Sequence, residues 1–417
     1  MEYSLRIFNT LTRKLETVEP REDRQVKMYT CGPSIYRQPH IGNYRTFLFE
    51  DILQRYLEYL EYDVTRLITL TDIEDKAIAE ADKEGIPIME LTQKIADIFF
   101  SDIKLLRIEY PAYTPRSSTT VDQAVKLIRI LLEEGYAYWF EHEGRRNVYF
   151  DPLKFKGFGK LSKLDMSRWP KRKRRFHKDN YSGTPWNMGD FILWHGYREG
   201  DEVYWDTEIG RGRPAWNVQD AAMITKHLGF TIDIACGGID NLVRHHDYTI
   251  AIVEGISGTE FSRYWLHGGH LFVDGKKMSK SKGNVYYPND LLNRGYSAEH
   301  IRFFLIYGHY RRRLNFTFEK MDRLKHKLDA FKNIVKDLER TESIESSDKA
   351  ERLVGEIITG FEENMNNDLD VKAAFDSLLD IVSELNILMK QNKLSSDDAH
   401  NALANLRRID QVLWIIF

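Results

Sequence analysis

Residues 25–72 decide the fold, and they read QVKMYTCGPSIYRQPHIGNYRTFLFEDILQRYLEYLEYDVTRLITLTD. The opening QVKMYT predicts a short strand. Apolar side chains then recur at helical spacing between Tyr44 and Leu60. The β-branched run 62–72 predicts a second strand. A strand, a helix and a strand within roughly 45 residues make a βαβ unit, which indicates a parallel sheet covered by helices.

The rest of the chain alternates in the same way, with one interruption. We expect further helices at 89–106, 120–135, 215–229 and 245–256, and further strands in FTIDIACGG and YWLHGGHLFV. Between 137 and 206, short aromatic β-like pieces (YAYWF, NVYF, FILWHG and VYWD) surround the cationic run KRKRR at 171–175, which indicates an insertion. After residue 310 the pattern is helical, with amphipathic helices expected at 321–338, 350–364, 371–391 and 396–415.

We therefore predict an α/β protein with a Rossmann-like parallel sheet, a connective insertion and a terminal α-helical bundle. The predicted divisions are 1–115 and 207–300 for the two halves of the sheet domain, 116–206 for the insertion and 301–417 for the bundle.

Composition narrows the class of protein. A formal net charge of -3 argues against a protein that coats nucleic acid through bulk positive charge. The two cysteines, Cys31 and Cys236, suggest no disulfide framework. MEYSLRIFNT does not resemble a signal peptide, and no apolar run is long enough to span a bilayer. We expect a cytoplasmic monomer that has no contact with membranes.

Two short motifs point to ATP. PHIGN (39–43) lies at a strand-to-helix junction, where unpaired N–H groups and the helix dipole favour phosphate. There Gly42 permits close approach of a nucleotide, and His40 and Asn43 can donate hydrogen bonds. KKMSKSKGN (276–284) supplies Lys277 and Lys280 on a cationic loop that suits a leaving pyrophosphate. Either motif alone is more often a surface loop, but the two together indicate an ATP site.

These motifs carry a resemblance to class I aminoacyl-tRNA synthetases, and the chain is most similar to the cysteinyl-tRNA synthetase family. Matching text includes MYTCGPSIYRQPHIGNYRTFLFEDILQRYLEYLEYDV, TDIEDKAI, FDPLKFKGFGKLS, GRGRPAWNVQDAAM, GGIDNLVRHHDYTIA, RYWLHGGHLFVDGKKMSKSKGN and HYRRRLNFT. The resemblance implies that ATP with Mg2+ and an amino acid form an aminoacyl-adenylate. It implies catalytic roles for His40, Asn43, Lys277 and Lys280, and ATP contacts by these residues and by Gly32, Gly42, Gly238, Asp240, Met278 and Ser279. By the same resemblance Asp240 holds the ribose, Trp216 closes over the amino acid, and the amino-acid pocket is formed by Cys31, Thr71, Trp216, Asp220, His245 and Thr249.

The chain departs from the family at the zinc ion that holds the substrate thiolate. The resemblance places the four zinc ligands at Cys31, Asp220, His245 and Thr249, but the family has Cys at the second position and Glu at the fourth. The family's HGGG is also ACGG here (235–238). Three candidate metal ligands remain, Cys31, Asp220 and His245, with Asp247 or Cys236 as a substitute fourth, so the retention of zinc stays open. Without metal, Asp220 either receives a donor-bearing substrate or pairs internally with His245.

The chain closes with RRIDQVLWIIF, where the family continues into an anticodon-reading domain. Its architecture resembles the shorter relatives that join cysteine to an amino-sugar in mycothiol biosynthesis. We therefore expect a tRNA-independent ligase that activates an amino acid other than cysteine and passes it to a small-molecule or protein amine.

The alternatives are a cysteinyl-tRNA synthetase that charges tRNA, a silent regulator that binds nucleotide or tRNA, and a nucleotidyltransferase. The run KRKRR, with 311–313, either contacts RNA phosphates or is a solvated loop.

Overall fold

The computed structural model describes residues 4–142, 144–165, 189–278 and 283–417. Its centre is a four-stranded sheet, built from β3 (Gln25–Thr30), β4 (Asp63–Ile68), β9 (Ile232–Gly238) and β10 (Ser262–Gly268). The strand order is β10-β9-β3-β4, and every neighbouring pair is parallel. The predicted Rossmann-like parallel sheet is confirmed.

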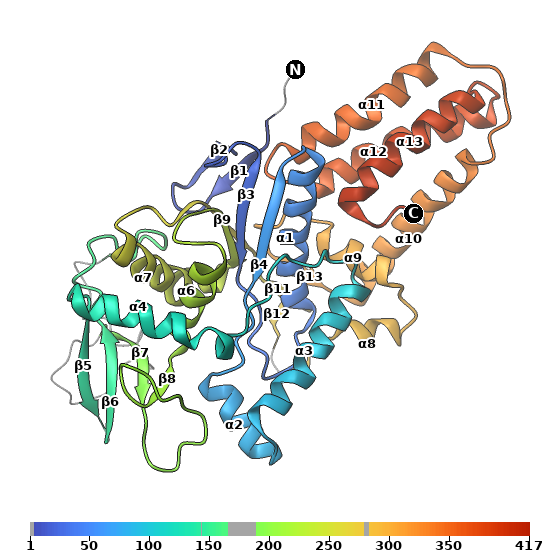
Figure 1. The fold of residues 1–417 in the computed structure, drawn as a ribbon. Coiled ribbons are helices and arrows are strands. Elements are labelled where there is room, and N and C mark those ends of the chain that lie inside the picture. The colour runs from blue at the N-terminus through green and yellow to red at the C-terminus, as the bar shows by residue number, and fades with distance from the viewer. Residues whose placement is uncertain (1–3, 143, 166–188, 279–282) are drawn as a thin grey trace.

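Helices cover both faces of this sheet (Figure 1). On one face lies α1 (Ile41–Tyr59), the crossover between β3 and β4. On the other face lie α4 (Val121–Glu133), α6 (Trp216–His227) and α7 (Asp247–Ser257). Side chains of alternate strand residues pack into separate hydrophobic cores. Met28 packs in the core that contains α1, and Tyr29 packs in the core that contains α6.

A second, antiparallel sheet lies at the lower left of Figure 1. Its order is β5 (Ala137–His142), β6 (Arg145–Phe150), β7 (Phe191–Gly196) and β8 (Gly212–Pro214). The strand predicted at 203–206 is wrong. Trp205 exchanges two backbone hydrogen bonds with Gly212 (2.7 and 3.0 Å), which makes an isolated bridge there, and β8 takes the edge of the sheet instead. The run at 171–175 lies outside the described residues.

The single strand predicted for YWLHGGHLFV is also wrong, because the chain changes sheets at its two glycines. β10 ends at Gly268, and β11 (Leu271–Val273) joins a small sheet with β12 (Lys276–Lys277) and β13 (Leu314–Phe316). A Cβ on Gly269 would lie 2.6 Å from the Arg312 carbonyl oxygen, so only glycine permits this crossing of backbones.

The C-terminal third is helical, as predicted, and stands at the upper right of Figure 1. Its elements are α8 (Pro288–Leu292), α9 (Ala298–Ile306), α10 (Phe318–Leu338), α11 (Asp348–Met365), α12 (Val371–Lys390) and α13 (Ser396–Leu413). Side chains of Thr317, Ser347, Asp370 and Ser395 accept hydrogen bonds from the first turns of the last four helices. Remaining elements are the hairpin β1 (Arg6–Asn9) and β2 (Lys14–Thr17), with α2 (Asp75–Glu84) and α3 (Ile88–Leu105). Among the described helices, none combines the length and the apolar character that a membrane span requires.

Candidate active site

The first turn of α1 presents hydrogen-bond donors at the carboxyl end of the sheet. His40 caps the helix, because its Nδ1 accepts from the Gly42 amide at 3.1 Å and its own amide donates to Asn43 Oδ1 at 3.0 Å. Burial lowers the pKa of His40, so the ring is neutral at pH 7. Because Nδ1 accepts, the ring proton lies on Nε2, and both Nε2 and the Asn43 amide nitrogen are donors suited to phosphate oxygens.

The two motifs that are 230 residues apart in sequence meet at Gly42. A Cβ there would lie 2.5 Å from Cε of Met278, which follows β12. Beside this contact is a hollow of about 490 Å³. Its lining includes His40, Asn43, Lys76, Asp240, Met278 and Tyr287.

Of the ten residues proposed for ATP, four line the hollow, namely His40, Asn43, Asp240 and Met278. Lys277 is exposed on β12, and Ser279 and Lys280 lie outside the described residues. Sequence reasoning missed Lys76, which is exposed on the first turn of α2 and carries its ammonium 5.7 Å from the Tyr36 ring centroid. The available signal was its place in TDIEDKAI (71–78), a segment that carries the family resemblance but to which no residue role was assigned.

Gly32 and Gly238 allow tight packing of the protein itself. A Cβ on Gly32 would lie 1.8 Å from the Thr69 carbonyl oxygen, so this glycine lets the loop after β3 lie against the end of β4. A Cβ on Gly238 would lie 2.7 Å from Oδ1 of Asp240. The backbone of Thr71 holds the same loop, since its carbonyl accepts from the Ile35 amide at 3.0 Å.

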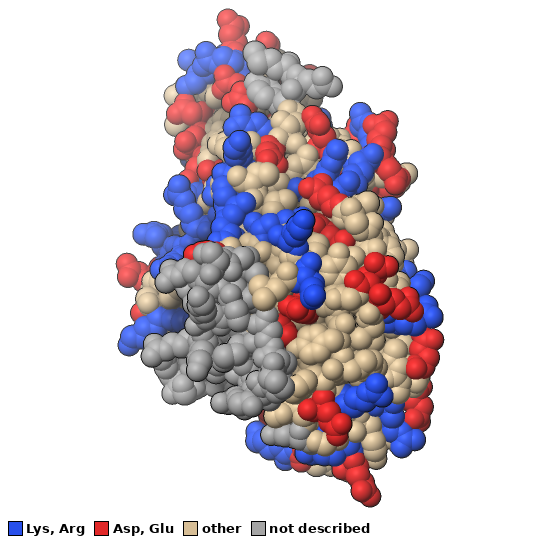
Figure 2. Space-filling model, turned by 90° about the vertical axis from the view of Figure 1, so that its left-hand side faces the viewer, with Lys and Arg blue, Asp and Glu red and all other residues tan. Residues whose placement is uncertain are grey.

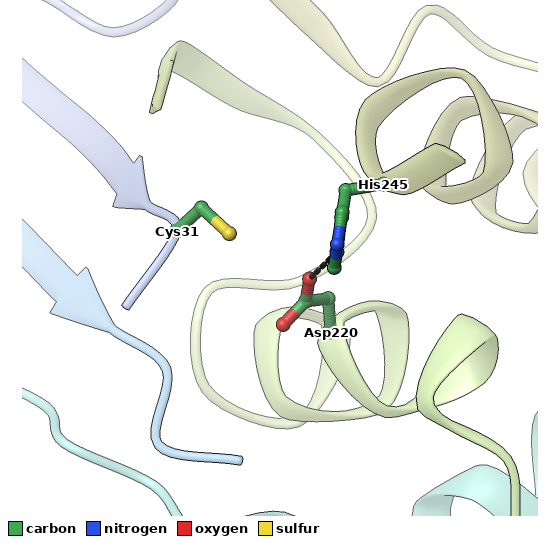
Figure 3. A group of neighbouring side chains, drawn as sticks. All are labelled: Cys31, Asp220 and His245. Atoms are coloured by element: carbon green, nitrogen blue, oxygen red, sulfur yellow. Dashed lines mark ion pairs between the residues drawn. The ribbon is translucent and has the colours of Figure 1, made fainter. Parts of the chain in front are cut away.

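Three side chains from separate elements converge beside this loop (Figure 3). Cys31 follows β3, Asp220 lies on α6, and His245 lies on the short π-helix η4 (Leu242–His246). Their ligand-type atoms all lie within 4.8 Å of one another. His245 Nδ1 is 3.7 Å from Asp220 Oδ2, and the Trp216 ring centroid is 4.8 Å from that of His245.

Among the described residues, no further His, Cys, Asp or Glu side chain joins this group as a fourth metal ligand. The Thr249 hydroxyl donates to the backbone carbonyl of His245 at 2.9 Å. The carboxylate of Asp247 accepts from the amides of residues 161 and 162, and Cys236 is buried within β9. His246 turns away from the group, with Nδ1 2.8 Å from Nε2 of His267.

The electrostatics of the group oppose a free thiolate. Burial, and then the charge of Asp220, raise the pKa of Cys31 well above its ordinary value. The fully buried hydroxyl of Tyr29 makes no hydrogen bond of normal geometry to a described residue, although it lies close to the Cys31 thiol and the Asp220 carboxylate. Burial and the nearby charge of Asp220 also raise the pKa of this phenol. Sequence reasoning missed Tyr29, although its place two residues before Cys31 in the strand direction puts both on one face.

The donor set fits a zinc ion. Cysteine sulfur, histidine nitrogen and a carboxylate oxygen are all zinc ligands, and three protein ligands with one open position are typical of catalytic zinc sites. A bound cation would also compensate the charge of Asp220 and favour the thiolate of Cys31.

Comparison with known proteins agrees with this geometry. Residues 17–326 match the family described as tRNA synthetases class I (C) catalytic domain. The chain is 39% identical over 417 residues to the cysteine–tRNA ligase of Chlamydia pneumoniae, a match that spans 99% of this chain and 86% of the relative. It is 36% identical over 411 residues to the cysteine–tRNA ligase of Brachyspira hyodysenteriae, which spans 97% of this chain and 85% of the relative.

Solved structures share the fold at low sequence identity. Mycobacterium tuberculosis methionyl-tRNA synthetase bound by methionyl-adenylate superposes with a TM-score of 0.69 at 15% identity, covering 93% of this chain and 92% of that one. The leucyl enzyme (LeuRS) of Agrobacterium radiobacter K84, in a ternary complex with tRNA, gives 0.69 at 12% identity, covering 95% and 85%. The chain therefore belongs to the class I aminoacyl-tRNA synthetase family of ATP-dependent ligases.

Proposed function

We propose that this protein activates cysteine with ATP and Mg2+ and transfers it to tRNA. One observation carries the proposal: the thiol, carboxylate and imidazole of Cys31, Asp220 and His245 converge within 4.8 Å. Cys31 begins the loop whose next residues, from Pro33 onward, line the ATP hollow. The full-length similarity to relatives named cysteine–tRNA ligase supports it. This choice reverses the sequence-based preference for another amino acid and an amine acceptor.

The ATP hollow suits the first half-reaction. A carboxylate oxygen of the amino acid attacks the α-phosphorus, the bond from this phosphorus to the bridging oxygen breaks, and pyrophosphate leaves. The Nε2 proton of His40 and the side-chain amide of Asn43 donate hydrogen bonds to the phosphate oxygens, while Asp240 accepts from the ribose hydroxyls. The ammonium of Lys277, on exposed β12 beside Met278, supplies positive charge to the phosphates. The attacking carboxylate is already ionised at pH 7, so the step needs no general base.

Zinc, when bound by Cys31, Asp220 and His245, would supply soft coordination to a substrate sulfur and so separate cysteine from serine. The protein itself shapes the pocket around that position. The Trp216 ring packs beside His245, and the Tyr29 hydroxyl, which makes no hydrogen bond of normal geometry to a described residue, is a donor close to Cys31 and Asp220.

A second candidate is a ligase whose pocket holds no metal. The ion-pair distance of 3.7 Å between His245 and Asp220 favours it, since the two side chains can satisfy one another. In that case Asp220 selects an amino acid whose side chain carries a hydrogen-bond donor. The acceptor of the activated acid is then a small-molecule or protein amine.

ATP–pyrophosphate exchange without tRNA separates the two candidates. The purified protein is assayed with cysteine, serine, diamino acids and basic amino acids, with and without a chelator, beside Asp220→Ala, Cys31→Ser and the control Cys236→Ala. Exchange with cysteine that chelation abolishes and zinc restores, together with cysteine charging of tRNA, supports the proposal. Chelator-resistant exchange with another amino acid, lost in Asp220→Ala, supports the second candidate. No exchange with any amino acid contradicts both and leaves a silent regulator.

A further inference from the structure

Positive charge is unevenly placed on this molecule, although its net charge is -3. On the face drawn in Figure 2, lysine and arginine side chains gather at mid-height, whereas both signs intermix toward the lower right. One strongly basic hollow, of about 490 Å³, lies between the end of α9, β13, the first half of α10 and the start of α12. Seven lysine and arginine residues line it. One is Arg45, whose guanidinium donates to backbone carbonyls, and the other six are Arg312, Arg313, Lys320, Arg323, Lys327 and Lys372.

Two of these cations are neutralised by the protein. Lys327 and Lys372 both bind the carboxylate of Asp376, Lys372 at 2.6 Å. The one acidic residue in the lining, Asp370, accepts from the Ala373 amide at 3.1 Å as the cap of α12.

The other four cations have no carboxylate partner among the described residues. Arg312, Arg313, Lys320 and Arg323 form neither an ion pair nor a side-chain hydrogen bond there. Aromatic rings instead support two of them. The Arg313 guanidinium carbon lies 5.4 Å from the Phe272 ring centroid, and the Lys320 ammonium lies 5.9 Å from that of Phe304.

Their mutual repulsion shows at Lys320. Burial, followed by the charges of Arg323 and Arg45, lowers the pKa of this ammonium. Lys320 and Arg323 are three residues apart and therefore lie on one face of α10. A multivalent anion seated between these side chains would relieve the repulsion and gain several charge-assisted hydrogen bonds.

We propose that this hollow is a second phosphate-binding site, separate from the ATP hollow. The two hollows have no lining residue in common. The phosphate groups come either from an RNA backbone or from a free oligophosphate. Only the RNA source rests on the proposed function, because phosphate binding here does not require amino-acid activation.

Charge reversal tests the site. The double variant Arg312→Glu/Arg323→Glu is compared with wild type and with Arg340→Glu, an exposed arginine in the turn that follows α10. Binding of inorganic tripolyphosphate is measured by calorimetry with the ATP hollow saturated by a non-hydrolysable ATP analogue. We expect the double variant to weaken binding by about tenfold or more, since each charged hydrogen bond contributes about 1.5–3 kcal/mol. The control changes it by less than about twofold, and ATP–pyrophosphate exchange is unchanged in both variants.

Filter binding of total bacterial tRNA identifies the source. If RNA supplies the phosphates, the slope of log K against log salt falls by about one for each RNA phosphate that the protein no longer neutralises, hence by about two in the double variant. Weaker binding of tripolyphosphate alone assigns the site to a free oligophosphate. The proposal is overturned if wild type binds neither probe, or if the double variant binds both as wild type does. Because neither probe involves an amino acid, these outcomes are independent of the proposed reaction.

Discussion

Replacing Arg302 by methionine should destabilise the protein strongly, because this arginine joins the sheet domain to the bundle from a buried position. Its guanidinium and the carboxylate of Asp51 are 1% and 0% exposed and meet at 2.7 Å. The same guanidinium donates to the carbonyls of Leu413 at 2.7 Å and Leu106 at 2.9 Å. Removing one partner of a buried pair costs about 3–5 kcal/mol. We expect a destabilisation near 3 kcal/mol, because Arg55 still contacts Asp51 at 3.1 Å.

The destabilisation should depend on pH. Burial alone would raise the pKa of Asp51, but the guanidinium groups of Arg302 and Arg55 hold it below its ordinary value. A carboxyl with a lowered folded-state pKa stabilises the protein fully above the unfolded pKa of about 4 and loses this contribution as pH falls through the folded pKa. The difference between wild type and Arg302→Met should therefore be constant from about pH 5 to 7 and shrink below about pH 4.

Urea unfolding followed by circular dichroism measures both effects. The matched control is Arg352→Met, whose side chain is 65% exposed and 3.6 Å from Glu356; its free energy of unfolding should change by less than about 1 kcal/mol. In the double variant Asp51→Asn/Arg302→Met, part of the stability should be recovered, because no unpaired carboxylate remains. A destabilisation below about 1 kcal/mol for Arg302→Met, or one that does not vary with pH, would refute the reasoning.

Three further substitutions test single contacts. Gly42→Ala places a Cβ 2.5 Å from Cε of Met278; since that end of the side chain is flexible, the fold should persist while the KM for ATP in pyrophosphate exchange rises about tenfold, and an unchanged KM would contradict the contact. Gly269→Ala places a Cβ 2.6 Å from the backbone oxygen of Arg312, so urea unfolding should show a destabilisation of about 2 kcal/mol or more; wild-type stability would count against the close crossing. Tyr29→Phe removes a buried hydroxyl that makes no hydrogen bond of normal geometry to a described residue, so stability should change by less than about 0.5 kcal/mol while the KM for the amino acid rises severalfold; equal KM values would exclude the hydroxyl from the pocket.

Periodicity predicted the fold correctly where apolar residues recur at regular spacing along a long segment. The helices α1, α3, α4 and α10 to α13 begin and end within a few residues of their predicted limits, because each buries one apolar stripe. Periodicity failed at residues 264–273, where the pattern of a single strand continues across Gly269 while the backbone changes sheets. The backbone at Gly269 changes sheets where it lies against the backbone of residue 312. A local sequence pattern cannot predict this contact, because the two residues are far apart in the sequence. The divisions at residues 115, 206 and 300 stay predictions.

The candidate site was predictable in its residue types but not in its partners. The resemblance placed Cys31, Asp220 and His245 together, yet the commitment of the Thr249 hydroxyl to a backbone carbonyl depends on the helical geometry of η4 and α7. Tyr29 was missed for the opposite reason. A tyrosine in a strand is usually core, and only the lack of a hydrogen bond of normal geometry from its hydroxyl to a described residue sets it apart.

Arg45 connects the helix beside the ATP hollow to the backbone around the proposed second phosphate site, yet the two sites can be tested separately. It lies on the first turns of α1, just after Asn43, and donates to backbone carbonyls that include those of Leu305 and Arg312. The helix that presents donors to the ATP hollow is thereby bonded to the backbone that carries the basic hollow. Arg45 is buried and donates to these carbonyls, so its replacement would disturb both hollows. A loss of binding in such a variant could therefore not be assigned to either hollow. Arg312 and Arg323 reach the second hollow without such bonds, so reversing their charge changes its potential and leaves the shared framework in place.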